Sequence, residues 1–141
     1  MKKIITTLLL FVASFGFSQT STTATTTTSS KNARFLVNTW NLYQTETFNA
    51  VHTPTTAQAG DQLVLSPDGS YKWIYNGVTE TGKYQINSTG TQITLSSGTG
   101  TKTLKVMEST ASNLKIDYKD ESDIHNILYY KSPAVAAASG K

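Results

Sequence analysis

Short runs of alternating hydrophobic and polar residues recur between residues 35 and 131, and nearly every gap between them is rich in Gly, Asn, Asp, Ser or Pro. This two-residue period is typical of half-buried strands, and no long segment has the helical period. The pattern predicts eight strands, at residues 35–43, 62–65, 70–75, 78–86, 92–95, 102–107, 113–118 and 124–130. Such a series predicts an all-β fold, an eight-stranded antiparallel up-and-down barrel. Its interior either fills with side chains or holds a small apolar molecule.

The Asn76-Gly77 pair is the best-specified turn in the sequence. A two-residue Asn-Gly loop selects a type I′ hairpin, because both residues tolerate positive φ. The turn therefore pairs Tyr75 with Val78, and the pairing continues outward along both strands. Residues that pair directly share a face of the sheet. One face then carries the aromatic side chains and is the predicted interior: Tyr71, Trp73, Val78, Glu80, Gly82, Tyr84 and Ile86.

Alternation in the other runs extends this interior. It adds Leu36, Trp40, Leu42, Ile93, Leu95, Leu104, Val106, Leu114, Ile116 and Tyr118. The last run has two possible registers. A five-residue turn before it sends Ile124, Asn126, Leu128 and Tyr130 inward, whereas a four-residue turn sends His125, Ile127 and Tyr129 inward. We favour the first register, because it leaves His125 outside.

The first 18 residues have the features of a secretory signal peptide. Two lysines precede a mostly apolar run at residues 4–14, and Gly16 and Ser18 place small residues at the −3 and −1 positions of a cleavage site before Gln19. The apolar run is shorter than the about 20 residues that span a bilayer. We therefore expect export to the periplasm or the medium, without stable membrane insertion.

The remaining chain divides into three parts. Residues 19–31 are a Thr/Ser-rich spacer with no periodicity, which we expect to be disordered, residues 32–131 form one domain, and residues 132–141 are a flexible small-residue tail. The chain has no cysteine, so disulfides are excluded. Without the two lysines of the signal, ten basic and nine acidic residues remain. Their signs alternate along the strands, so we expect no nucleic-acid partner. We also expect a monomer.

Several short motifs resemble those of the short bacterial lipocalin-like domains. Asn38-Thr39-Trp40 looks like the lipocalin Gly-x-Trp motif, and Asp68-Gly69-Ser70-Tyr71 looks like the first of a set of repeating turn-and-strand motifs. Two further motifs follow in the order of that family, Thr81-Gly82-Lys83-Tyr84-Gln85-Ile86 and Ile93-Thr94-Leu95. The resemblance covers residues 33–131. It implies an eight-stranded calycin-type barrel and the transport or sequestration of small hydrophobic molecules.

The sequence offers one candidate ligand site, the mouth of the barrel. Aromatic walls with a few polar groups are typical of small-molecule pockets. Glu80, near the Asn76-Gly77 turn, is the candidate polar anchor, and the alternative is a solvated rim carboxylate. The long connection at residues 44–61 is a candidate lid that carries Phe48, Val51 and His52, and the alternatives are a plug or an idle surface loop. The predicted ligand-binding residues are Trp40, Phe48, Tyr71, Trp73, Glu80, Tyr84 and Tyr118.

Catalytic and metal-binding chemistry has little support in the sequence. His52, His125 and the carboxylates of residues 120–123 lack the spacing of a metal site, so we expect no metal and no cofactor. The sequence has no cysteine nucleophile, no Gly-x-Ser-x-Gly elbow and no His-Glu-x-x-His motif. We therefore expect a protein that is not an enzyme. An enzyme would require a polar cluster inside the barrel, for instance Glu80 with a histidine.

Two functions remain open from the sequence. The first is an exported lipocalin-like protein that binds a small hydrophobic molecule in the barrel mouth. The alternative is a non-enzymatic structural or interaction module with a filled barrel core. Its docking patch would lie on the outward side chains of Ile74, Ile127 and Tyr129.

Overall fold

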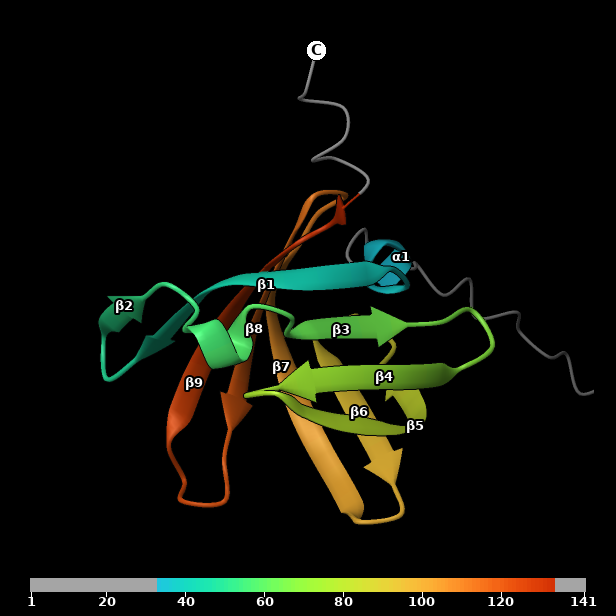
Figure 1. The fold of residues 1–141 in the computed structure, drawn as a ribbon. Coiled ribbons are helices and arrows are strands. Elements are labelled where there is room, and N and C mark those ends of the chain that lie inside the picture. The colour runs from blue at the N-terminus through green and yellow to red at the C-terminus, as the bar shows by residue number, and fades with distance from the viewer. Residues whose placement is uncertain (1–32, 134–141) are drawn as a thin grey trace, which may run out of the picture.

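The computed structural model describes residues 33–133, which form one closed antiparallel barrel (Figure 1). The predicted signal peptide and spacer, and nearly all of the predicted tail, lie outside these residues. The elements are α1 (Ala33–Leu36), β1 (Thr39–Thr47), β2 (Ala50–His52), η1 (Thr56–Gln58), β3 (Gln62–Leu65), β4 (Ser70–Tyr75), β5 (Val78–Ile86), β6 (Gln92–Ser97), β7 (Gly100–Ser109), β8 (Asn113–Lys119) and β9 (His125–Lys131). Each strand from β3 to β8 pairs with its successor, and β1 pairs with both β3 and β9, which closes the sheet. Eight strands therefore form the barrel, as predicted, and β2 is an additional edge strand on β1.

The predicted β4–β5 hairpin is confirmed in register. Tyr75 pairs with Val78, Trp73 with Glu80 and Tyr71 with Gly82. Asn76 and Gly77 have φ values of 50° and 74°, as a type I′ turn requires.

The favoured register of the last strand is confirmed as well. The connection between β8 and β9 contains five residues, 120–124. Asn126, Leu128 and Tyr130 are buried, and His125 is exposed.

The predicted first strand is wrong at its start. Residues Ala33–Leu36 form one turn of helix, and β1 begins only at Thr39 and continues to Thr47. The indole Nε1–H of Trp40 donates to the carbonyl of Leu36 at 3.0 Å, and both side chains are fully buried. The short helix thus closes one end of the barrel, opposite the end at which the β1–β2 hairpin lies (Figure 1).

The long connection predicted at residues 44–61 is shorter than expected. β1 passes through an irregularity between Leu42 and Gln44 and then turns at Phe48 and Asn49 into β2. Both turn residues have positive φ, 52° and 62°. Phe48 is 81% exposed and Val51 is 59% exposed, so the alternative in which they fold down as a plug is wrong. The β1–β2 pairing holds them out on a projecting hairpin instead.

The core contains most of the predicted inner face of the sheet, together with Leu63 and Leu65 of β3, which the sequence analysis did not name. Val78, predicted inside, is 70% exposed because it lies at the tip of the β4–β5 hairpin, so that prediction is wrong. Tyr84 and Ile86 are partly buried and pack against the core. The buried hydrophobic side chains of the core are Leu36, Trp40, Leu42, Leu63, Leu65, Tyr71, Trp73, Ile93, Leu95, Leu104, Val106, Leu114, Ile116, Tyr118, Leu128 and Tyr130. Large apolar side chains each contribute about 1.5–3 kcal/mol on burial, so this set supplies the main stabilisation of a domain without disulfides. Among residues 33–133, no helix is long and apolar enough to cross a lipid bilayer.

Candidate functional site

The mouth of the barrel holds a pocket of about 230 Å³, which we call the mouth pocket. Four strands and the β4–β5 turn contribute to it, because alternation turns their last inward side chains toward the open end. Its lining residues are Trp73, Tyr75, Asn76, Val78, Glu80, Lys102 and Tyr118. The pocket therefore combines aromatic walls with one carboxylate and one ammonium group.

Three aromatic rings form the apolar wall of the mouth pocket. Trp73 and Tyr75 are stacked, with ring centroids 5.3 Å apart and planes at 15°. Tyr118 meets both rings edge-on, at centroid distances of 5.0 Å from Trp73 and 5.7 Å from Tyr75. Such pairs add about 0.5–1.5 kcal/mol beyond the area they bury. The Nε1–H of Trp73 also donates to the hydroxyl of the buried Tyr130 at 3.1 Å. This hydrogen bond fixes the Trp73 ring from the core side of the pocket.

Glu80 is the carboxylate residue in the lining of the mouth pocket. Its carboxylate accepts a hydrogen bond from the Tyr71 hydroxyl at 2.6 Å, and its other oxygen pairs with the Lys102 ammonium. The Glu80 side chain is only 18% exposed, and that of Lys102 is 29% exposed. Burial raises the pKa of Glu80, but hydrogen bonds from Lys102 and Tyr71 and the Lys102 charge outweigh it, so the pKa lies below its usual range. Glu80 is therefore ionised at neutral pH.

The pKa of Tyr71, the donor in this hydrogen bond, is shifted as well. Burial, and then the hydrogen bond to Glu80, raise the pKa of Tyr71 to about 12. The phenol therefore stays protonated and remains a donor to the carboxylate throughout the physiological range. Tyr71, Glu80 and Lys102 thus form one hydrogen-bonded group of hydroxyl, carboxylate and ammonium.

A buried aspartate fixes the turn that carries the pocket rim. Asp61, which is 3% exposed, accepts the backbone N–H groups of Asn76 at 2.6 Å and Gly77 at 3.0 Å. Gln58, in η1, donates its side-chain amide to the Asn76 side chain at 2.6 Å. The connection between β2 and β3 thus positions the β4–β5 turn, and with it Tyr75.

A second pocket of about 320 Å³ adjoins the first, and we call it the rim pocket. It lies between the β6–β7 turn and the β8–β9 turn, and Lys102 and Tyr118 line both pockets. Its other lining residues are Thr99, Gly100, Thr101, Thr103, Lys119, Asp120 and Glu121. The rim pocket is therefore the more polar of the two.

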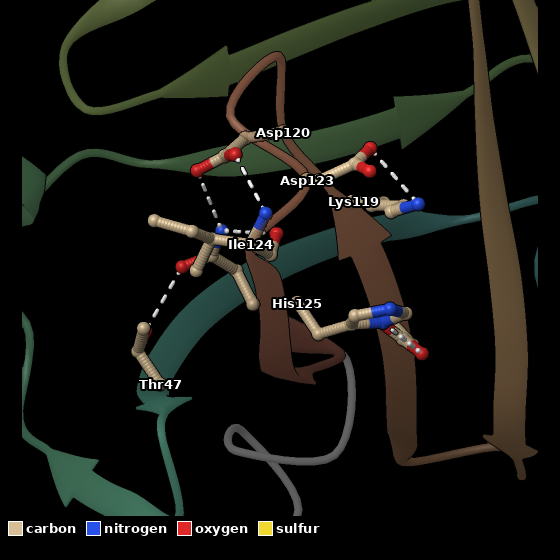
Figure 2. A network of polar contacts seen from close by, with 8 residues as sticks. Thr47, Lys119, Asp120, Asp123, Ile124 and His125 are labelled. Carbon is tan, nitrogen blue, oxygen red and sulfur yellow. Dashed lines mark hydrogen bonds and ion pairs between the residues drawn. The ribbon is translucent and has the colours of Figure 1, made fainter.

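Hydrogen bonds hold the β8–β9 turn in place, as Figure 2 shows. The Asp120 carboxylate accepts the backbone N–H groups of Ser122 at 2.9 Å and Ile124 at 3.0 Å. It also accepts the side-chain amide of Asn126, which in turn accepts the Thr47 hydroxyl at 2.9 Å. The hydrogen bond from Ile124 is the largest of the contacts that lower the pKa of Asp120. The turn therefore keeps an ionised carboxylate at the rim.

The structure brings together only part of the predicted ligand-binding set. Trp73, Glu80 and Tyr118 line the mouth pocket, and Tyr71 contacts it through Glu80. Trp40 lies at the closed end under α1. The Tyr84 hydroxyl donates to the Ser66 carbonyl at 2.7 Å, away from the pocket lining.

The role predicted for Phe48 stays a prediction. Its exposed ring lines a separate outward-facing pocket with Ile124 and Ile127. His52 is exposed in β2, and His125 pairs with Asp117 at 2.9 Å. Within residues 33–133, no three His, Asp or Glu side chains are grouped closely enough to hold a metal ion.

The sequence analysis missed two important members of the pocket, Tyr75 and Lys102. Both could have been found from the two-residue period. Tyr75 follows Tyr71 and Trp73 on the inner face of β4, and Lys102 precedes Leu104 and Val106 on the inner face of β7. An inward lysine interrupts the hydrophobic alternation, so the hydrophobic pattern alone does not mark Lys102.

No family model and no curated protein matches the sequence. A search of solved structures finds the crystal structure of a lipocalin-like protein from Bacteroides uniformis ATCC 8492. The alignment covers 69% of this chain and 97% of that chain, with a TM-score of 0.50 and 16% sequence identity. At this identity the likeness concerns the fold, and it agrees with the closed eight-stranded antiparallel barrel described above. The fold of residues 33–133 is that of a lipocalin-like β-barrel.

Proposed function

We propose that this barrel is a binding protein for a small, largely apolar compound of single-ring size, and that it is not an enzyme. The observation that carries the proposal is the mouth pocket, where the rings of Trp73, Tyr75 and Tyr118 face an anchored carboxylate. A largely apolar wall with few, well-placed polar groups is the usual composition of a ligand pocket. The lipocalin-like fold is typically a binding fold.

The size of the pocket limits the ligand. An apolar cavity of about 150 Å³ holds benzene, and pockets for drug-sized ligands measure about 300–1,000 Å³. At about 230 Å³ the mouth pocket suits one substituted ring. Below it the interior is packed with buried side chains, so long fatty acids and retinoids are expected to bind weakly or not at all.

Tryptophan fluorescence provides the test. Trp73 lines the pocket, and Trp40 lies at the closed end. In a Trp40→Phe variant the emission comes from Trp73 alone, since the chain has two tryptophans. Titration with single-ring aromatic compounds is expected to shift this emission and raise the melting temperature, whereas fatty acids and retinoids leave both unchanged. If no compound changes either signal, the protein is not a binder of this class.

A pair of tyrosine variants separates pocket binding from surface binding. Tyr75→Ala removes one ring of the pocket wall and is expected to weaken binding about three- to tenfold, the value of one aromatic contact. Tyr43→Ala is the control, because Tyr43 is exposed and contacts Tyr129 outside the pocket. Equal effects of the two substitutions would place the ligand elsewhere.

We also propose that the protein is exported. The support is the sequence pattern of the first 18 residues, a basic start followed by an apolar run and small residues before Gln19. In a bacterial host, mass spectrometry of the processed protein is expected to find Gln19 as the first residue. An unprocessed chain that stays in the cytoplasm would refute this part of the proposal.

A further inference from the structure

Lys102 occupies an unusual position, at the boundary between two pockets. Its side chain lines both the mouth pocket and the rim pocket. In this structure its ammonium pairs with Glu80 inside the mouth pocket. A lysine side chain is long and has several rotatable bonds, so the same residue can place its ammonium in either pocket.

The ammonium of Lys102 shows that the mouth pocket accommodates a positive charge. Glu80 supplies the counter-charge, and Tyr71 holds that carboxylate from the other side at 2.6 Å. The rings of Trp73 and Tyr118 line the same space, and aromatic faces attract cations. A ligand ammonium would meet the same three kinds of partner.

The charges around the mouth also favour a cation. The Asp61 carboxylate lies against the β4–β5 turn, and Asp123 pairs with Lys119 at 2.9 Å. The carboxylates that line the two pockets outnumber the ammonium groups that line them: Glu80, Asp120 and Glu121 against Lys102 and Lys119. A mouth with this excess attracts cations and repels anions over the range of a Debye length, about 8 Å at physiological salt.

We propose that the ligand of the mouth pocket is a small aromatic amine, and that its ammonium replaces that of Lys102 at Glu80. Lys102 then turns into the rim pocket, where Asp120 and Glu121 provide carboxylates. The aromatic ring of the ligand lies against Trp73, Tyr75 and Tyr118. This inference rests on the proposed binding function and names the ligand class of the same pocket. In the protein without ligand, the Lys102 ammonium occupies the position at Glu80 that the ligand ammonium takes on binding.

Three ligands with one ring and different charge test the inference by calorimetry on the folded protein: 2-phenylethylamine, 2-phenylethanol and phenylacetate. The amine is expected to bind at least about tenfold more tightly than the alcohol, because a hydrogen bond to a charged group is worth about one power of ten in affinity or more. Phenylacetate is expected to bind most weakly, since it meets Glu80 with a like charge.

Two substitutions should act in opposite directions. Glu80→Gln removes the counter-charge and is expected to weaken amine binding at least about tenfold and to reduce the preference for the amine over the alcohol. Lys102→Met removes the competing ammonium and is expected to strengthen amine binding about tenfold. Lys105→Met is the control, because Lys105 is an exposed lysine on the same strand that lines neither pocket. If Lys102→Met does not fold, Lys102→Gln keeps a hydrogen-bond donor for Glu80 and gives the same comparison.

The outcomes separate the two proposals. If the amine and the alcohol bind equally, or phenylacetate binds best and Lys102→Met weakens it, the amine assignment is overturned and the binding function stands. Such a preference for phenylacetate would make Lys102 itself the ligand contact. If none of the three compounds binds, both proposals fail.

Discussion

Gly82 is a position in the barrel where one added methyl group is expected to lower the stability of the fold strongly. It lies in β5 opposite Tyr71 of β4 and close to the backbone of β6. A Cβ atom at this position would lie 2.0 Å from the Ser96 carbonyl oxygen and 2.9 Å from Cε1 of the Tyr71 ring. The first of these neighbours is backbone in a paired strand, so it has no other rotamer to adopt. Gly82→Ala therefore has to separate β5 from β6 and tilt the Tyr71 ring.

The cost follows from the packing of the interior. Overpacking a well-packed core typically costs about 1–3 kcal/mol, and a clash with paired backbone belongs at the upper end of that range. We expect Gly82→Ala to lower the free energy of unfolding by about 2–3 kcal/mol. For a domain of this size that corresponds to a fall of roughly 10–20 °C in melting temperature. Urea unfolding and calorimetry measure the two quantities independently.

Gly98→Ala is the control. Gly98 lies in the β6–β7 turn, where an added Cβ meets nothing within 4 Å and no positive φ is required. We expect a change between zero and a gain of about 1 kcal/mol, because alanine restricts the unfolded chain. If Gly82→Ala is as stable as Gly98→Ala, then β5 and β6 do not approach each other this closely at Gly82. Because Tyr71 also donates to Glu80, Gly82→Ala is expected to weaken ligand binding as well.

Three further predictions concern groups that support the site and the closed end. Asp61→Ala leaves the two amides of the β4–β5 turn without their acceptor and should lower the free energy of unfolding by about 2–3 kcal/mol in urea; an unchanged value would mean that water replaces the carboxylate. Trp40→Phe removes the donor to the Leu36 carbonyl and should lower the free energy of unfolding in urea by about 1 kcal/mol; an unchanged value would mean that the indole hydrogen bond does not stabilise the closed end. Near-ultraviolet titration should find a phenol that ionises near pH 12 and is absent in Tyr71→Phe. Because this pKa is raised on folding, Tyr71 stabilises the fold fully below about pH 10, and the contribution is lost as pH rises toward 12.

The β4–β5 hairpin was predictable because its determinants are local. Asn76 and Gly77 tolerate positive φ, so the turn type and the register follow from two residues. The last strand left two registers open, since a shift of one residue exchanges the faces. Its choice depends on the 120–124 turn, where Asp123 adopts a φ of 64° and Asp120 binds the turn amides.

The start of the barrel was not predictable from periodicity. Leu36 and Trp40 are four residues apart, and this spacing places side chains on one face of a strand and equally on one face of a helix. The chain adopts a helical turn there because the indole of Trp40 can then bond the Leu36 carbonyl inside the closed end of the barrel. Residues 45–52 were equally ambiguous, because polar side chains in β1 carry no alternating signal.

Alternation and turn chemistry by themselves determine most of the strands and their inward-facing positions from β3 to β9, because these depend on neighbours in the chain. Only the tertiary structure decides that Glu80 and Lys102, 22 residues apart in sequence, form one ion pair across the end of β6. It also decides that the rings of β4 and β8 pack deeply enough to fill the interior and still leave a pocket at the mouth. Both outcomes depend on how side chains from distant strands share a small volume, and no local pattern in the sequence encodes that volume.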